Sequence, residues 1–183
     1  MNYKERMWVH CHHRFGLAGE GQADIIESLV KSRPGRVITV GCGANGEHIK
    51  NLARQTQTLI AVDKCPDAVK KAAAAAGSEP NVRFVVSNAR QLCFADESFN
   101  DIVALGLFAE VPQGETRDVM TEFSRISKPT GHLMLTNSVL RPIELYRECG
   151  VQSGFEVVRE CEGHCPAAPE GIKRRYLLVF IKK

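Results

Sequence analysis

Residues 37–53 read VITVGCGANGEHIKNLA. An apolar, β-branched run breaks into a glycine-rich turn, and the turn leads into a segment that can start a helix. Glycines in such a turn let a ligand approach the backbone closely, and the unpaired N–H groups of the following helix attract negative charge. The stretch predicts a strand, a tight loop and a helix that together bind a nucleotide-like ligand.

A second β-branched run, residues 58–62, ends at Asp63, which lies 22 positions after Gly41. The ends of consecutive parallel strands lie at one edge of a sheet, and an acid at this spacing can bind the hydroxyls of a ribose. The same glycine spacing is the fingerprint of dinucleotide-binding domains. A nicotinamide-dependent oxidoreductase that binds NAD(P) is therefore one alternative.

The composition is that of an ordinary globular domain. The chain has 183 residues, 44% apolar and 25% charged, enough for one α/β domain with a buried core. A net charge of +3 gives no basis for a nucleic-acid partner, and no apolar run reaches the length of a membrane span. Seven cysteines without a secretory segment predict a cytoplasmic protein with reduced thiols. We assign residues 22–183 to one domain and residues 1–21 to an N-terminal lid or tail segment.

The rest of the chain alternates between helix and strand patterns. Helical patterns cover residues 25–30, 68–76, 119–126 and 141–149. Strand-like apolar runs cover residues 82–86, 101–105, 132–136, 155–158 and 176–181. No segment with helical periodicity separates the last two runs, so they predict an antiparallel pair at the end of a mostly parallel sheet.

In this order the motifs resemble those of the class I S-adenosylmethionine-dependent methyltransferases, in particular small enzymes of the quinone-biosynthesis type with a type 11 methyltransferase domain. Residues 40–53 look like the family's first motif, and Asp63 falls where the family places its ribose-binding acid. Residues 87–103 are similar to the segment from the adenine-binding loop into the fourth strand, and residues 122–132 to the approach to the fifth. The resemblance covers residues 25–182.

The resemblance implies an α/β fold: a Rossmann-like, doubly wound, seven-stranded sheet in a three-layer αβα arrangement, mostly parallel with a C-terminal antiparallel pair. It also implies S-adenosylmethionine as cofactor and direct displacement of its methyl group by a small-molecule acceptor. The main tasks of the protein would then be to align the reactants and exclude water. The residues expected to bind the cofactor are Gly41, Cys42, Gly43, Gly46, Asp63, Lys64, Asn88, Ala89, Leu105 and Gly106.

Three features depart from the family pattern. Thr39 stands where members commonly carry an acid, and the glycine motif is stretched, with Asn45 inside it. Asn88 replaces the more frequent aspartate that meets the adenine amino group, and its side-chain carbonyl can accept the same hydrogen bond. We expect adenine recognition to be kept and the methionine end of the cofactor to be held differently.

Residues for proton transfer and for the acceptor are predicted by residue type and position. The N-terminal segment often folds over the cofactor in this family, so the candidate bases are His10, His12 and His13. A solvated polar stretch is the alternative for these histidines. The candidates for the acceptor pocket are Tyr3, Trp8, Phe108 and Asn137. For the aromatic residues among them, packing of the lid or the core is the alternative.

A metal-binding or regulatory module with the same fold is a further alternative. Residues 10–13, His-Cys-His-His, and the segment from Cys161 to Cys165 carry ligands that Zn²⁺ accepts. Their spacings match no standard finger, and the simpler interpretation of the two cysteines is small residues in a loop, so we predict no metal site. Cys42 has no evident activating base and is expected to pack beneath the glycine loop.

Overall fold

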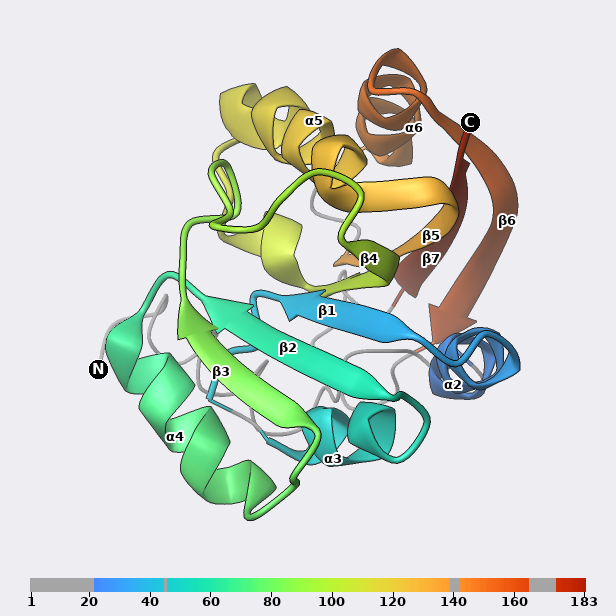
Figure 1. The fold of residues 1–183 in the computed structure, drawn as a ribbon. Helices are drawn as coiled ribbons and strands as arrows, with labels where there is room; N and C mark the ends of the chain where they lie inside the picture. Colours follow the sequence, from blue (N-terminus) through green and yellow to red (C-terminus); the bar gives the residue numbers. More distant parts are fainter. Residues whose placement is uncertain (1–21, 45, 139–141, 165–173) are drawn as a thin grey trace.

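The computed structural model describes residues 22–44, 46–138, 142–164 and 174–183, which form a seven-stranded sheet between layers of helices (Figure 1). The strand order is β3-β2-β1-β4-β5-β7-β6, with β7 antiparallel to both its neighbours and the other pairs parallel. The predicted fold class is confirmed, including the C-terminal antiparallel pair. The strands are β1 (Arg36–Val40), β2 (Thr58–Asp63), β3 (Val82–Val86), β4 (Phe99–Leu105), β5 (Ser127–Ser138), β6 (Phe155–His164) and β7 (Arg174–Lys182).

The helices form a layer on each side of the sheet (Figure 1). One face is covered by α2 (Gln22–Ser32), α3 (Glu47–Ala53) and α4 (Pro66–Ala76), and the other by α5 (Thr116–Ile126) and α6 (Ile143–Gln152). Two 3-10 turns, η1 (Leu107–Ala109) and η2 (Gln113–Glu115), join β4 to α5. Within the described ranges, no helix has the length and apolar character needed to cross a membrane.

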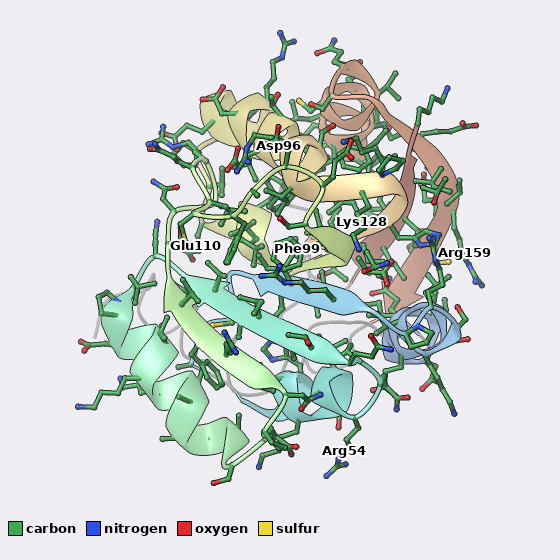
Figure 2. All side chains as sticks on the ribbon, in the orientation of Figure 1. Arg54, Asp96, Phe99, Glu110, Lys128 and Arg159 are labelled. Atoms are coloured by element: carbon green, nitrogen blue, oxygen red, sulfur yellow. The ribbon has the colours of Figure 1, made fainter. Side chains whose placement is uncertain are left out.

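The central strands are buried on both faces, as their continuous apolar sequences predict. In β1, Val37 packs into the core shared with α2, α3 and α4, whereas Ile38 packs into the core shared with α5 and α6. Phe99 at the start of β4 is fully buried, while Arg54 and Arg159 point away from the body (Figure 2). The alternation of side chains along each strand therefore supplies both cores.

The alanine-rich run forms helix α4, as predicted. Pro66 lies in its first turn, where a missing N–H does no harm, and Gly77 follows its end with a φ of +71°. Ala72 and Ala76 are buried in the core that α4 shares with α3. Their short side chains let the two helices approach closely.

Strands β5 and β6 extend furthest beyond their predicted ranges, because pairing with neighbouring strands continues past their apolar runs. β5 begins at Ser127, which pairs with Phe99 of β4, although the apolar run begins only at residue 132. β6 runs to His164 because it pairs with β7 along its whole length, past an irregularity after Val157 that breaks the side-chain alternation. Cys161 accordingly lies in β6 and packs against the core, so its placement in a loop was wrong.

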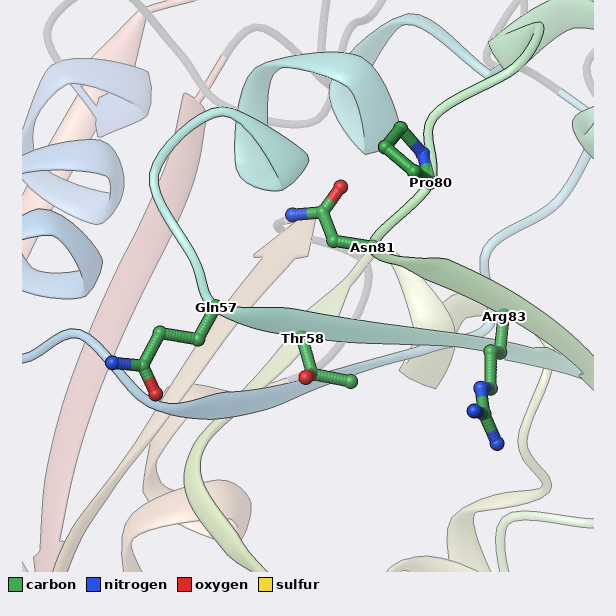
Figure 3. Close-up of a pocket in the computed structure, with 5 residues that line it drawn as sticks. All are labelled: Gln57, Thr58, Pro80, Asn81 and Arg83. Atoms are coloured by element: carbon green, nitrogen blue, oxygen red, sulfur yellow. The ribbon is translucent and has the colours of Figure 1, made fainter.

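A shallow hollow lies at the edge of the sheet where β2 and β3 begin (Figure 3). This is the edge opposite to the carboxyl ends of the parallel strands, where the cofactor is expected. The hollow is thus separate from the predicted site. It is lined by Gln57, Thr58, Pro80, Asn81 and Arg83.

Candidate cofactor site

Predicted site residues lie together at the carboxyl ends of the first four strands. The chain goes from β1 outward to β2 and β3 and then returns to β4 on the other side of β1, so the strand order changes direction between β1 and β4. Ligands of open parallel sheets bind outside the carboxyl ends of the strands at such a point. The loop after β1, Asp63 at the end of β2, Asn88 after β3 and Gly106 after β4 are all at this edge.

Asp63 ties the glycine loop to the end of β2. Its Oδ2 accepts a hydrogen bond from the backbone N–H of Gly43 at 2.9 Å, and its Oδ1 accepts one from the N–H of Cys65 at 2.9 Å. The carbonyl of Val62 accepts the N–H groups of both Gly41 and Cys42, at 2.8 and 2.9 Å. Each carboxylate oxygen can accept more than one hydrogen bond, so Asp63 can anchor the loop and still accept ligand hydroxyls.

The turn after β1 needs glycine at two positions. Gly41 has a φ of +76° and Gly43 a φ of +60°, in the left-handed region that L side chains rarely adopt. A Cβ built on Gly41 would lie 2.9 Å from Cδ1 of Leu107, in the turn after β4. The first glycine therefore permits close packing between the ends of β1 and β4, in addition to the turn itself.

Gly106 provides open backbone at the end of β4. Its φ is +69°, and a Cβ built on it would meet nothing within 4 Å. Its N–H donates to Oγ1 of the buried Thr136, at 3.1 Å, and lies 3.3 Å from the Thr136 carbonyl, which fixes this turn to β5. A ligand can reach the backbone here without displacing a side chain.

Helix packing accounts for the glycine at position 46, whereas the sequence predicted a contact with the cofactor there. A Cβ on this residue would lie 2.4 Å from the backbone N of Ala76 and 2.8 Å from the carbonyl oxygen of Ala72, both in α4. The residue is buried at the N-terminal end of α3. Close approach of α4 therefore accounts for this glycine, and a contact with the cofactor stays a prediction.

Asn88 lies in a tight turn after β3, which we call the Asn88 turn (residues 87–91). Oδ1 of Asn88 accepts the N–H of Arg90 at 3.0 Å, and its backbone carbonyl accepts the N–H of Gln91 at 2.9 Å. The N–H of Ser87 donates to the carbonyl of Asp63 at 3.0 Å. The side chain of Asn88 is exposed, so a second lone pair of its carbonyl oxygen remains for an adenine amino group.

Helix α5 holds the chain that follows the Asn88 turn, through two residues to which the sequence analysis assigned no role. Oε1 of Glu122 accepts the N–H of Leu92 at 2.6 Å. The guanidinium of Arg125 bonds both oxygens of Glu122 and the carbonyls of Leu92 and Phe94. The hydrogen bond from Arg125 lowers the pKa of Glu122, against the effect of its partial burial. Their i,i+3 spacing on the predicted helix was the available signal.

With this geometry in place, the comparison with known proteins gives the family. The methyltransferase domain family matches residues 37–131, about half of the chain, from β1 to the start of β5. The chain belongs to the methyltransferase domain family. Its cofactor is accordingly S-adenosylmethionine, and this replaces the nicotinamide-dependent oxidoreductase as the interpretation of the glycine spacing.

Two relatives of this methyltransferase domain are distant in sequence. The chain is 27% identical over 139 residues to a phosphatidylethanolamine N-methyltransferase of Cereibacter sphaeroides, covering 74% of this chain and 66% of that protein. It is 30% identical over 133 residues to the methyltransferase GfsG of Streptomyces halstedii, covering 68% and 45%. The match therefore spans just under two thirds of the first relative and less than half of the second.

A solved structure supports the fold over nearly the whole chain. The TehB-like S-adenosylmethionine-dependent methyltransferase of Corynebacterium glutamicum superposes with a TM-score of 0.72 at 17% identity, covering 98% of this chain and 96% of that one. The site described above also fits the cofactor chemically. Asp63 can accept ribose hydroxyls, and the open backbone at Gly106 leaves room that a side chain would fill.

Cys42 lies under the glycine loop of the methyltransferase domain, as expected for a small packing residue. Its thiol is buried among the residues of the core next to α3 and α4. Burial, together with the negative charge of Asp63, raises the pKa of Cys42 to about 12. The raised pKa keeps the thiol neutral at physiological pH, which agrees with a packing role for Cys42.

Phe108 belongs to the core in this structure, which supports the alternative of core packing. It is fully buried in η1, with its ring centroid 5.0 Å from that of Tyr146 and 6.5 Å from that of Phe123. A role in the acceptor pocket would require it to be reached from the site, and stays a prediction. Asn137 lies in β5, where it pairs with Tyr176 of β7. Tyr3, Trp8, His10, His12 and His13 lie outside the described residues.

The remaining cofactor candidates are near the same strand ends. Lys64 is exposed directly after Asp63, Ala89 is half-buried against the core, and Leu105 is buried at the end of β4. In the part of the chain that the structure describes, no group of three or more His, Cys, Asp or Glu side chains is arranged to hold a metal ion. Cys165 lies outside that part.

Proposed function

We propose that the chain transfers the methyl group of S-adenosylmethionine to a small-molecule acceptor by direct displacement. The observation that carries this proposal is the juxtaposition of Asp63, bonded to the loop after β1, with the open backbone of Gly106 after β4. Asp63 and Gly106 lie at the ends of the two strands that flank β1, both at the carboxyl edge of the sheet, and the chain belongs to a methyltransferase family.

Each strand end has a distinct task in this proposal. Asp63 accepts the two ribose hydroxyls, and the backbone of Gly41 to Gly43 approaches the methionine part. Asn88 accepts the adenine amino group, with Ala89 beside it. When bound, S-adenosylmethionine supplies a methyl group on a positively charged sulfur, which needs no covalent help from the protein. The chain therefore acts by orienting the reactants and excluding water.

The acceptor is proposed to be small because the described chain carries little beyond the cofactor-binding sheet and its helices. One relative is named for phosphatidylethanolamine, an amine-bearing lipid, and we infer only that a small nucleophile is the class to test first. If the acceptor must lose a proton, His10, His12 and His13 are the proposed bases, on the N-terminal segment, residues 1–21, for which we propose the role of a lid. Of the two described candidates for the acceptor pocket, the proposal keeps Asn137 in β5 and assigns the fully buried Phe108 to the core.

The test is formation of S-adenosylhomocysteine from S-adenosylmethionine, measured with a panel of small amines, phenols and thiols. Asp63→Ala should abolish turnover at limiting cofactor, while Asp118→Ala should not change it. Asp118 is a matched control because it is an exposed aspartate on α5, where no hydrogen bond to its side chain is found among the described residues. Turnover that is equal in both variants would refute the assignment of the site.

Deletion of residues 1–15 tests the proposed role of the N-terminal segment. The deletion keeps the glycine loop, Asp63 and Asn88, so cofactor binding should remain. Turnover should fall much more than binding, because a covering segment excludes water and helps to place the acceptor. Unchanged turnover would assign residues 1–15 to a tail and remove His10, His12 and His13 from the proposal.

A further inference from the structure

Besides the hydrogen bond from Ser87 to Asp63, two sets of contacts from the connection between β4 and β5 hold the Asn88 turn and the residue after it. Leu92, the residue directly after the turn, is bonded by Glu122 and Arg125, whose side chains are 12% and 32% exposed. The tip of the turn is bonded by an ion pair at the surface, where Nη1 of Arg90 lies 3.0 Å from Oε1 of Glu115. Both side chains of this pair are partly exposed, at 43% and 36%.

The ion pair joins two segments that follow different strands. Arg90 belongs to the turn after β3, and Glu115 is the last residue of η2, in the connection that follows β4. Both connections start at the carboxyl edge of the sheet, where the cofactor is proposed to bind. The pair therefore closes a bridge across this edge, from one loop of the site to another.

The geometry of the turn couples this bridge to Asn88. The N–H of Arg90, the residue that bonds Glu115, donates to the side-chain oxygen of Asn88 at 3.0 Å. Two more hydrogen bonds close the same turn, from the N–H of Gln91 to the Asn88 carbonyl at 2.9 Å and from the Ser87 hydroxyl to the Gln91 carbonyl at 3.3 Å. The backbone of Arg90 and the side chain of Asn88 are therefore parts of one hydrogen-bonded turn.

We propose that Arg90 and Glu115 are positioning residues that set the Asn88 turn in its cofactor-binding conformation before the cofactor arrives. The inference rests on the proposed function, because the turn has this task only if adenine binds there. A turn that is already ordered loses less conformational entropy when the ligand binds. The ion pair is therefore expected to increase the affinity for the cofactor. An exposed ion pair contributes little to global stability. Removing it should therefore hardly change the free energy of unfolding.

The experiment compares Arg90→Gln and Glu115→Gln with Glu160→Gln. Glu160 pairs with Arg147 at similar exposures, 39% for the arginine and 31% for the glutamate, on α6 and β6, away from the site. We expect the Kd for S-adenosylmethionine to rise about twofold to fivefold in both site variants and not in Glu160→Gln. Glu115 directly precedes α5, so Glu115→Gln also removes a negative charge near the N-terminus of that helix. Arg90→Gln does not, so a rise in Kd that both variants share cannot come from the helix dipole.

Three further measurements separate positioning from general stability. The double variant Arg90→Glu/Glu115→Arg should restore the affinity, and high salt should weaken the wild-type affinity toward that of Glu115→Gln. The free energy of unfolding from urea denaturation should be nearly the same in Arg90→Gln as in the wild type. Wild-type binding with an unchanged Kd in both site variants would overturn the inference and leave the proposed function standing. Failure of the wild type to bind S-adenosylmethionine would overturn both.

Discussion

The carboxylate of Asp63, at the end of β2, accepts the backbone N–H of Gly43 at 2.9 Å. This bond links the two features that the sequence marks most clearly, the acid after the second strand and the glycine loop after the first. The residue proposed to bind ribose therefore also shapes the loop proposed to bind the methionine part. The binding of the ribose and the shape of the loop for the methionine part therefore depend on the same side chain.

Asp63→Ala should lower both cofactor affinity and stability. The substitution leaves the N–H groups of Gly43 and Cys65 without their acceptor, and we expect the free energy of unfolding to fall by about 1–3 kcal/mol. Binding of S-adenosylmethionine should become too weak to detect by calorimetry at micromolar protein. Urea denaturation and calorimetry on the same preparation check the two effects. A folded variant with wild-type affinity would remove Asp63 from the site.

Gly43→Val should abolish binding while the protein still folds. The φ of +60° at this position disfavours any side chain and is worst for a β-branched one, at a cost of about 1–3 kcal/mol. The branched side chain would also enter the space proposed for the methionine part. Calorimetry with S-adenosylmethionine, after circular dichroism has established folding, measures the effect. Normal binding by this variant would give the loop another purpose.

Gly46→Ala should destabilise the protein through helix packing. Its Cβ would lie 2.4 Å from the backbone of α4, and backbone atoms cannot yield as the end of a side chain can, so we expect a loss of about 1–3 kcal/mol. Gly114→Ala is the control, because a Cβ there meets nothing within 4 Å and its φ is not positive. Thermal denaturation should show a lower Tm for Gly46→Ala alone. Equal Tm values would contradict the packing seen at α3 and α4.

Glu122→Gln should reduce the loss of stability in acid. The hydrogen bond from Arg125 lowers the pKa of Glu122 in the folded protein, so this carboxylate stabilises the fold above its unfolded pKa of about 4.3. That contribution disappears as the pH falls through the lower folded pKa. The variant should be less stable than the wild type at pH 7, and the difference should narrow below pH 5. A difference that stays constant from pH 7 to pH 3 would contradict this.

Cys42 should resist alkylation in the folded protein. With a pKa of about 12, only about one thiol in ten thousand is ionised at pH 8, and the side chain is buried. Cys65 and Cys93 are exposed and should react with iodoacetamide within minutes. Peptide mass mapping after a short exposure distinguishes the three, and labelling in urea provides the control. Rapid labelling of native Cys42 would mean that the loop opens readily.

The sequence was sufficient for the sheet because its strands are long apolar runs between glycines and prolines. The runs at residues 37–40 and 58–62 correspond to β1 and β2 almost to the residue. Strand β6 was underestimated because residues 159–164 are largely polar, and pairing with β7 alone keeps them extended. Propensity carries no information about such a partner.

The sequence predicted those residues of the candidate site whose place directly after a strand indicates their role. It did not predict the residues that act through contacts between elements far apart in the chain. Asp63 and the glycines follow from their places after strands. The bonds from Glu122 and Arg125 to Leu92 span about thirty residues, and the sequence shows only two charged residues on a helix. Gly46 differs from both groups. The sequence predicted a contact with the cofactor for it, whereas the close approach of α4 already accounts for a glycine at this position.

The central claim is that the carboxyl edge of β1, β2 and β4 binds S-adenosylmethionine. Isothermal titration calorimetry of the full chain tests it most directly, with S-adenosylmethionine in one series and NAD in a parallel one. The account predicts saturable binding of one S-adenosylmethionine per chain, competition by S-adenosylhomocysteine, loss of binding in Asp63→Ala and no heat from NAD. Binding of NAD, or S-adenosylmethionine binding that Asp63→Ala leaves unchanged, would contradict it.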